Sequence, residues 1–67
     1  MVTKDQAGRY AMLVIYQAEL ERVRCGSLQK EGLVDEIRSI ANEKGLGDLM
    51  PGFLPYLKIM MKRDLGE

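Results

Sequence analysis

The sequence predicts an all-α fold, a three-helix unit with a long first helix and a shorter second and third helix. Residues 4–25 contain no proline and lie between Thr3, a good N-cap, and Gly26, a residue that suits a helix C-terminus. Apolar residues recur at helical spacing from Leu33, and Pro55 suits the first turn of a last helix. The 67 residues are enough for one small domain.

The first predicted helix, over residues 4–25, spans roughly 33 Å. Its centre is YAMLVIY, from Tyr10 to Tyr16, a run of seven apolar residues that is apolar on every face of a helix. The alternative for this segment is a buried strand, because valine, isoleucine and tyrosine favour strands. We prefer the helix, since both flanks are helix-like and the chain offers no second strand pattern.

The second predicted helix has two possible starts. Ser27 can cap an early start, or the helix begins after Gly32, because a glycine inside a helix costs about 1 kcal/mol. From Leu33 the pattern is one-sided, and Gly45 ends it. The stripe consists of Leu33, Val34, Ile37, Ile40, Ala41 and Lys44.

The third helix is predicted from about Pro55 to Leu65. Asp48 follows a turn and can cap a short helical turn that tolerates Pro51 near its start. Pro55 disfavours a helical conformation at Leu54 and suits a first helical position itself. The apolar set of this helix is Tyr56, Leu57, Ile59, Met60, Met61 and Leu65.

The small size of the domain, residues 1–67, predicts oligomerisation. A chain of this length buries only about 60% of the surface that its unfolded form exposes, and small scaffolds compensate with disulfides, a metal or assembly. One cysteine, Cys25, rules out an internal disulfide, and the lack of histidine removes the common zinc ligand sets. Two short helices also leave part of the first helix uncovered. We therefore expect a homodimer with a helical-bundle core.

Charge and hydropathy indicate the environment of the chain. Ten basic and ten acidic residues give a formal net charge of zero, so the chain as a whole has no broad attraction for nucleic acid or anionic lipid. The opening MVTKDQAGRY has charges of both signs and no apolar core followed by a cleavage site, so we expect no signal peptide. No apolar run approaches the ~20 residues of a spanning helix. We expect a cytoplasmic protein, and a lone cysteine fits a reducing compartment.

The residue inventory predicts neither an enzyme nor a cofactor or metal site. Without histidine there is no imidazole base, no His-based triad and no Cys-His dyad. Arg22 and Arg24 near Cys25 favour a thiolate, although a small residue at a helix end is the simpler interpretation. Glu31 and Asp35 are four residues apart but lack further ligands at helical spacing, which indicates a solvated surface.

The surplus of apolar residues predicts interaction surfaces. The candidate self-association residues are Tyr10, Leu13, Val14, Gln17 and Leu20. Alanines at 7, 11 and 18 permit a partner helix to approach closely. The tail LMPGFLPYLKIMMKR, residues 49–63, has no acidic group, and it can cover the first two helices, bind a partner or meet a membrane interface. Its candidate partner-binding residues are Phe53, Tyr56, Met60 and Met61.

The predicted function is a small regulatory or interaction protein that self-associates and binds a protein partner. The alternative is a small DNA-binding regulator. Ala41, followed four residues later by Gly45 within EIRSIANEKGL, is similar to the first helix and turn of a DNA-binding helix-turn-helix. Residues 33–65 would be a degenerate form of that motif, because two prolines and a glycine stand where its recognition helix should begin.

Overall fold

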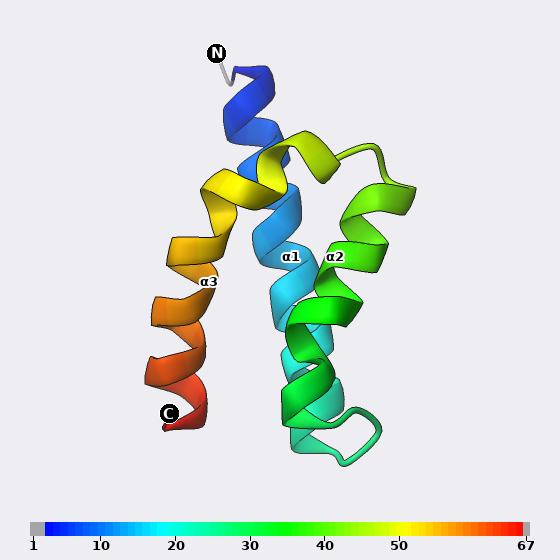
Figure 1. Ribbon diagram of the computed structural model, residues 1–67, viewed down its shortest axis with the longest axis vertical. Helices are drawn as coiled ribbons and strands as arrows, with labels where there is room; N and C mark the ends of the chain where they lie inside the picture. Colours follow the sequence, from blue (N-terminus) through cyan, green and yellow to red (C-terminus); the bar gives the residue numbers. More distant parts are fainter. Residues whose placement is uncertain (1–2, 67) are drawn as a thin grey trace.

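The computed structural model describes residues 3–66, which form helices joined by short turns (Figure 1). The elements in chain order are α1 (Lys4–Arg24), η1 (Lys30–Gly32), α2 (Leu33–Glu43), η2 (Gly47–Leu49) and α3 (Met50–Leu65), where η marks a 3₁₀ turn. No strand occurs in the described part of the chain, which confirms the predicted all-α fold with three helices. α1 and α3 run in the same direction, and α2 runs in the opposite direction between them in the chain (Figure 1).

α1 begins with the cap that the sequence predicts. The Thr3 hydroxyl accepts a hydrogen bond from the backbone N–H of Gln6 at 3.1 Å, and the Gln6 side chain accepts one from the backbone N–H of Thr3 at 3.0 Å. This reciprocal pair is a capping box. The helix ends at Arg24, and Gly26 follows in the left-handed region with φ of 85°. The segment YAMLVIY lies inside α1, so the strand alternative is wrong.

α2 takes the later of its two possible starts and begins directly after Gly32. Its predicted stripe packs into the core through Leu33, Ile37 and Ala41, which are buried. Lys44 does not belong to the stripe, because it is exposed and lies past the last helical residue. The polypeptide then turns at Gly45, whose φ of 74° lies in the left-handed region that favours glycine.

The predicted start of the third helix at Pro55 is wrong, because α3 begins at Met50. Pro51 falls in the first turn, where a helix needs no N–H donor. Pro55 lies inside the helix and cannot donate to the carbonyl four residues before it. The axis of α3 bends in this region, so that its first turns cross one end of the molecule and the rest descends beside α1 (Figure 1). Asp48 lies within η2 and provides no side-chain cap.

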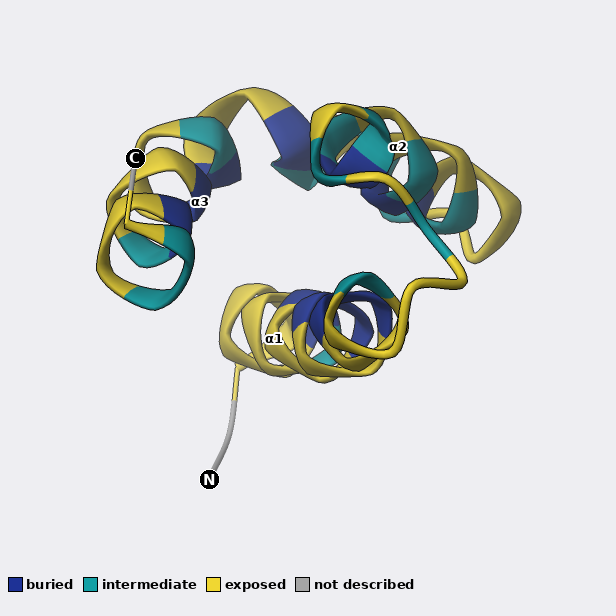
Figure 2. Cartoon of the chain, turned by 90° about the horizontal axis from the view of Figure 1, so that it is seen from below, coloured by how far each residue is buried: buried dark blue, intermediate teal, exposed yellow. Residues whose placement is uncertain are grey.

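The three helices share one hydrophobic core. Its largest fully buried side chains are Tyr16, Met12, Leu20, Leu33, Ile37 and Leu57. Figure 2 looks along the long axis and shows the buried faces of the helices directed toward a common centre, with an exposed face of α1 directed away from it. The molecule measures 36 × 23 × 19 Å, so α1 extends along most of its length.

The core covers only part of the apolar centre of α1. Within this run, the side chains of Met12, Ile15 and Tyr16 are buried. Tyr10 and Val14 remain 69% and 53% exposed. Two partner helices thus leave a substantial apolar face of α1 in contact with solvent. None of the helices between residues 3 and 66 has both the length and the apolar character needed to cross a bilayer.

Candidate interaction surface

A groove of about 320 Å³ lies between α1 and α3. It is lined by Arg9, Leu13, Phe53, Tyr56, Ile59 and Met60. Phe53 is buried and belongs to the core, whereas Tyr56 and Ile59 are 56% and 66% exposed. The groove therefore has an apolar floor continuous with the core, apolar walls open to solvent, and one cation.

Helical spacing explains why these residues meet. Arg9 and Leu13 are four residues apart, which places them on one face of α1. On α3, Phe53 and Tyr56 are three residues apart and Met60 follows after four more, so they form a stripe along one side. The two faces therefore border the same groove, over about one turn of α1 and two turns of α3.

The outer face of α1 continues this apolar surface. Tyr10 precedes Leu13 by three residues and Val14 by four, so the exposed area extends from the groove onto the solvent side of the helix. We define the outer face of α1 as Ala7, Tyr10, Ala11, Val14, Gln17 and Ala18. The exposed large apolar side chains of the described residues are Tyr10, Leu13, Val14, Tyr56 and Ile59. All of them lie on the outer face of α1 or in the groove.

The structure distributes the candidate self-association residues between surface and core. Tyr10, Leu13, Val14 and Gln17 are exposed on α1. Leu20 is only 1% exposed and packs into the core of its own chain. Leu20 therefore cannot contribute to an interface on the surface of α1.

The candidate partner-binding residues of α3 are divided in the same way. Tyr56 is exposed and Met60 is half-buried, and both line the groove. Phe53 and Met61 are core residues at 5% and 8% exposed, although Phe53 also reaches the groove floor. The groove brings Leu13 of α1 together with Phe53, Tyr56 and Met60 of α3, whereas Met61 does not line it.

Sequence reasoning missed Arg9 and Ile59 as lining residues. Ile59 lies three residues after Tyr56, and Arg9 lies four residues before Leu13, so helical spacing from the named candidates would have found both. A search for apolar residues does not identify Arg9 as a lining residue, because a charged residue is normally assigned to a solvated face.

A hydrogen bond between side chains of α1 and α3 closes the core beside the groove. The Tyr16 hydroxyl donates to Asp64 Oδ2 at 2.7 Å, and Arg63 donates to the same carboxylate through Nε at 2.9 Å. The hydrogen bond from Arg63, followed by that from Tyr16, lowers the pKa of Asp64 to about 2. Burial, followed by the hydrogen bond to Asp64, raises the pKa of Tyr16 to about 12. The carboxylate and the phenol therefore keep their charge states over a wide pH range.

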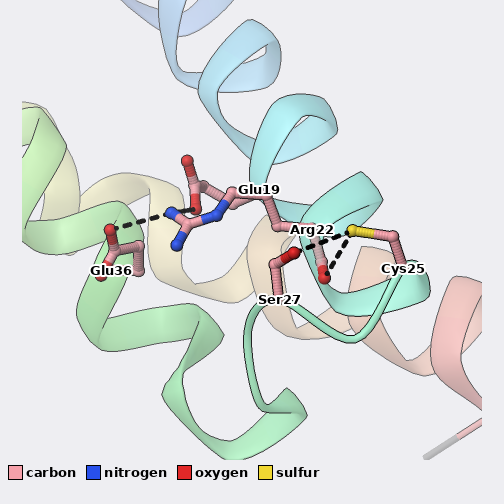
Figure 3. A network of polar contacts seen from close by, with 5 residues as sticks. All are labelled: Glu19, Arg22, Cys25, Ser27 and Glu36. Carbon is pink, nitrogen blue, oxygen red and sulfur yellow. Dashed lines mark hydrogen bonds and ion pairs between the residues drawn. The ribbon is translucent and has the colours of Figure 1, made fainter.

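A second polar network joins α1 to α2. Figure 3 shows the Arg22 guanidinium between two carboxylates, with Nη1 2.7 Å from Glu19 and 3.2 Å from Glu36. Glu19 is buried, at 6% exposed, so Arg22 compensates a carboxylate that water reaches poorly. These contacts raise the pKa of Arg22, the hydrogen bond to Glu36 being the largest cause.

Cys25 lies at the end of α1 and is exposed. Its Sγ is 3.2 Å from Ser27 Oγ and 3.4 Å from the carbonyl oxygen of Arg22 (Figure 3). The hydrogen bond with the Ser27 side chain is the main cause that lowers the pKa of the thiol. The sequence placed Arg22 and Arg24 near this thiol, but both form ion pairs with carboxylates instead. Arg24 lies 3.8 Å from Glu21.

No cluster of three or more His, Cys, Asp or Glu side chains that could hold a metal ion occurs among residues 3–66. The apolar groove and the adjoining outer face of α1 are thus the surfaces with the clearest potential for binding.

Comparison with models of known protein families found no match, and comparisons with curated proteins and with solved structures found none either.

Proposed function

We propose that this chain is a small helical interaction protein that self-associates through the outer face of α1 and binds a protein partner in the α1–α3 groove. One observation carries the proposal: the large exposed apolar side chains of the described residues gather on these two adjoining surfaces. Scattered apolar residues are normal on a protein surface, but a contiguous patch indicates an interaction site.

The composition of the outer face of α1 suits pairing of two copies. Tyr10 and Val14 supply apolar area, and the alanines around them allow two helix backbones to approach closely. A two-fold axis would place this face against itself, which a closed dimer requires. The two copies of α1 would then form the centre of a helical bundle. A small domain gains stability from such burial, because its own core is limited.

A non-enzymatic, cytoplasmic role is part of the same proposal. The absence of histidine from the sequence removes the most common general base, and the single cysteine agrees with a reducing compartment. The groove favours binding over chemistry, since its polar lining consists of one guanidinium and the phenol of Tyr56, with no thiol and no carboxylate.

The substitution Val14→Glu tests self-association. Val14 is half-exposed in the single chain, so a glutamate there leaves the core intact but places a charge in the proposed dimer interface. We expect the wild type to be dimeric by light scattering across a concentration series and the variant to be monomeric with an unchanged helical circular dichroism spectrum. Ser39→Glu adds the same charge on the exposed side of α2 and should remain dimeric. A wild type that is monomeric throughout the series would refute self-association.

One observation favours the alternative of DNA binding: a helix follows the turn after α2, and it carries Lys58, Lys62 and Arg63. However, the first turns of α3, residues 50–55, have no hydrogen-bonding side chain with which to read base edges. We therefore favour protein binding. A duplex-DNA titration at low salt tests this choice, and a salt-dependent affinity would restore the alternative.

A further inference from the structure

The charges of this neutral chain are separated between its helices. Three basic residues, Lys58, Lys62 and Arg63, and one acidic residue, Asp64, give α3 a formal charge of +2. α2 carries three acidic residues and one basic residue, which give it a formal charge of −2. The side of the molecule that contains the groove is therefore basic, and the side formed by α2 is acidic.

Arg9 brings a positive charge into the groove itself. It is exposed, lines the groove, and forms no ion pair with any described residue, including Asp5 one turn earlier. The one acidic residue of α3, Asp64, is occupied by Tyr16 and Arg63. The groove thus combines apolar walls with a guanidinium that has no carboxylate partner within the described residues.

We infer that the occupant of the groove is an amphipathic helix of a partner protein with acidic residues beside its apolar stripe. This inference rests on the proposed function of the groove as a protein-binding surface. Apolar side chains of the helix would contact Leu13, Tyr56 and Ile59, in the way that amphipathic helices fill apolar grooves. A carboxylate one turn away would form a charge-assisted hydrogen bond with Arg9, and the field of α3 would favour the same charge.

A second copy of this chain fits the groove less well. The acidic helix of the chain is α2, but its apolar stripe, Leu33, Ile37 and Ala41, is buried in its own core. A second copy therefore cannot present an apolar stripe and acidic flanks on that helix. An anionic membrane would match the charge of α3, yet a flat surface would leave a concavity of about 320 Å³ unfilled. A protruding row of side chains on a helix complements both the shape and the charge.

Selection from a peptide library tests the chemistry of the occupant. The library displays amphipathic helices with apolar residues at i, i+3, i+4 and i+7 and with flanking positions varied among Glu, Gln and Lys. We expect selection on the full-length chain to enrich Glu over Lys. The affinity of the selected peptide, measured by fluorescence anisotropy, should fall roughly 5- to 10-fold for Arg9→Gln, the effect expected from loss of one charge-assisted hydrogen bond.

Lys58→Gln is the matched control, because it removes the same charge from a residue that does not line the groove. We expect it to change the affinity less than about twofold. Ile59→Ser should weaken binding at least as much as Arg9→Gln. Ile59 is exposed, so this variant should keep its fold, which circular dichroism tests. Enrichment of Lys or Gln, or equal effects of Arg9→Gln and Lys58→Gln, would overturn the inference. Binding to phosphatidylserine vesicles that the peptide does not displace would also overturn it, in favour of a membrane.

The masses of these variants separate this inference from the proposed self-association. If Ile59→Ser converts a dimer to a monomer while Val14→Glu does not, a second copy occupies the groove and the inference is wrong. If the wild type is monomeric and still binds the acidic peptide through Arg9, the inference stands and self-association through the outer face of α1 is wrong.

Discussion

The Tyr16 hydroxyl donates a hydrogen bond of 2.7 Å to Asp64, and this bond joins the middle of α1 to the last turn of α3. The two residues are 48 positions apart in the chain. Tyr16 is fully buried, and its ring packs in the core while its hydroxyl reaches the carboxylate at the edge. The bond lies between the two helices that border the groove, so it helps to set the separation of the groove walls.

Replacement of Tyr16 by phenylalanine should lower the free energy of unfolding by about 1.5–3 kcal/mol, because the ring remains in place and one hydrogen bond to a carboxylate is lost. Urea unfolding followed by circular dichroism measures this change. Tyr10→Phe is the control, since Tyr10 is 69% exposed, and it should change the same quantity by less than about 0.5 kcal/mol. Equal effects of the two substitutions would show that the Tyr16 hydrogen bond contributes nothing specific.

Asp64 predicts an acid limb in the stability profile. Its pKa in the folded chain is about 2, below the ordinary value of 3.8, so the folded form favours the carboxylate. The corresponding stability is complete above about pH 4 and is lost as the pH falls toward 2. Urea midpoints across this interval should decline less steeply for Asp64→Asn than for the wild type. Parallel profiles would contradict the assignment.

Tyr16 predicts a second limb at high pH. Its pKa in the folded chain is about 12 instead of 10, so the folded form favours the protonated phenol. The resulting stability is complete below about pH 10 and decreases as the pH rises toward 12. We expect Tyr16→Phe to reduce the decline in urea midpoint over this interval. An unaltered decline would mean that other groups govern the alkaline limb.

Removal of the Arg22 guanidinium should destabilise the chain more than removal of a typical surface cation. Arg22→Gln leaves the poorly hydrated Glu19 without the charge that now lies 2.7 Å away. Arg38→Gln breaks a 3.7 Å pair with Asp35, whose side chain is 83% exposed, and exposed pairs contribute little. Thermal unfolding should therefore give a lower midpoint for Arg22→Gln than for Arg38→Gln. The opposite order would refute a role for the Glu19–Arg22–Glu36 network.

Two glycines inside helices should respond differently to alanine. A Cβ at Gly52 would meet nothing within 4 Å, so Gly52→Ala should stabilise α3 by about 0.5–1 kcal/mol through helix propensity. A Cβ at Gly8 would overlap the side chain of Leu49 and force it to move, which offsets the same gain. Urea unfolding should rank Gly52→Ala as clearly the more stable variant. A Gly8→Ala variant of equal stability would show that Leu49 relocates freely.

Local sequence signals predicted the first two helices well. The Thr3 cap, the Gly26 stop and the stripe from Leu33 depend on residues within one or two turns of each other, and all three are present. The start of α3 was mispredicted for a tertiary reason. Local preference opposes a helix across Pro55, but the helix from Met50 buries Met50 and Phe53 in the core. That burial outweighs one missing hydrogen bond.

By itself, the sequence determined that this chain is helical, that it contains no histidine, and that α1 has more apolar surface than two short helices can cover. It could not assign that surplus to particular residues. Tyr10 and Tyr16 belong to the same apolar run, yet one is 69% exposed and the other is fully buried. The packing of α2 and α3 against α1 decides which of the two side chains is buried. A side chain of α1 is buried only if it points toward the helices that cover α1. The same packing placed Arg9 between apolar walls, a position that no local pattern encodes.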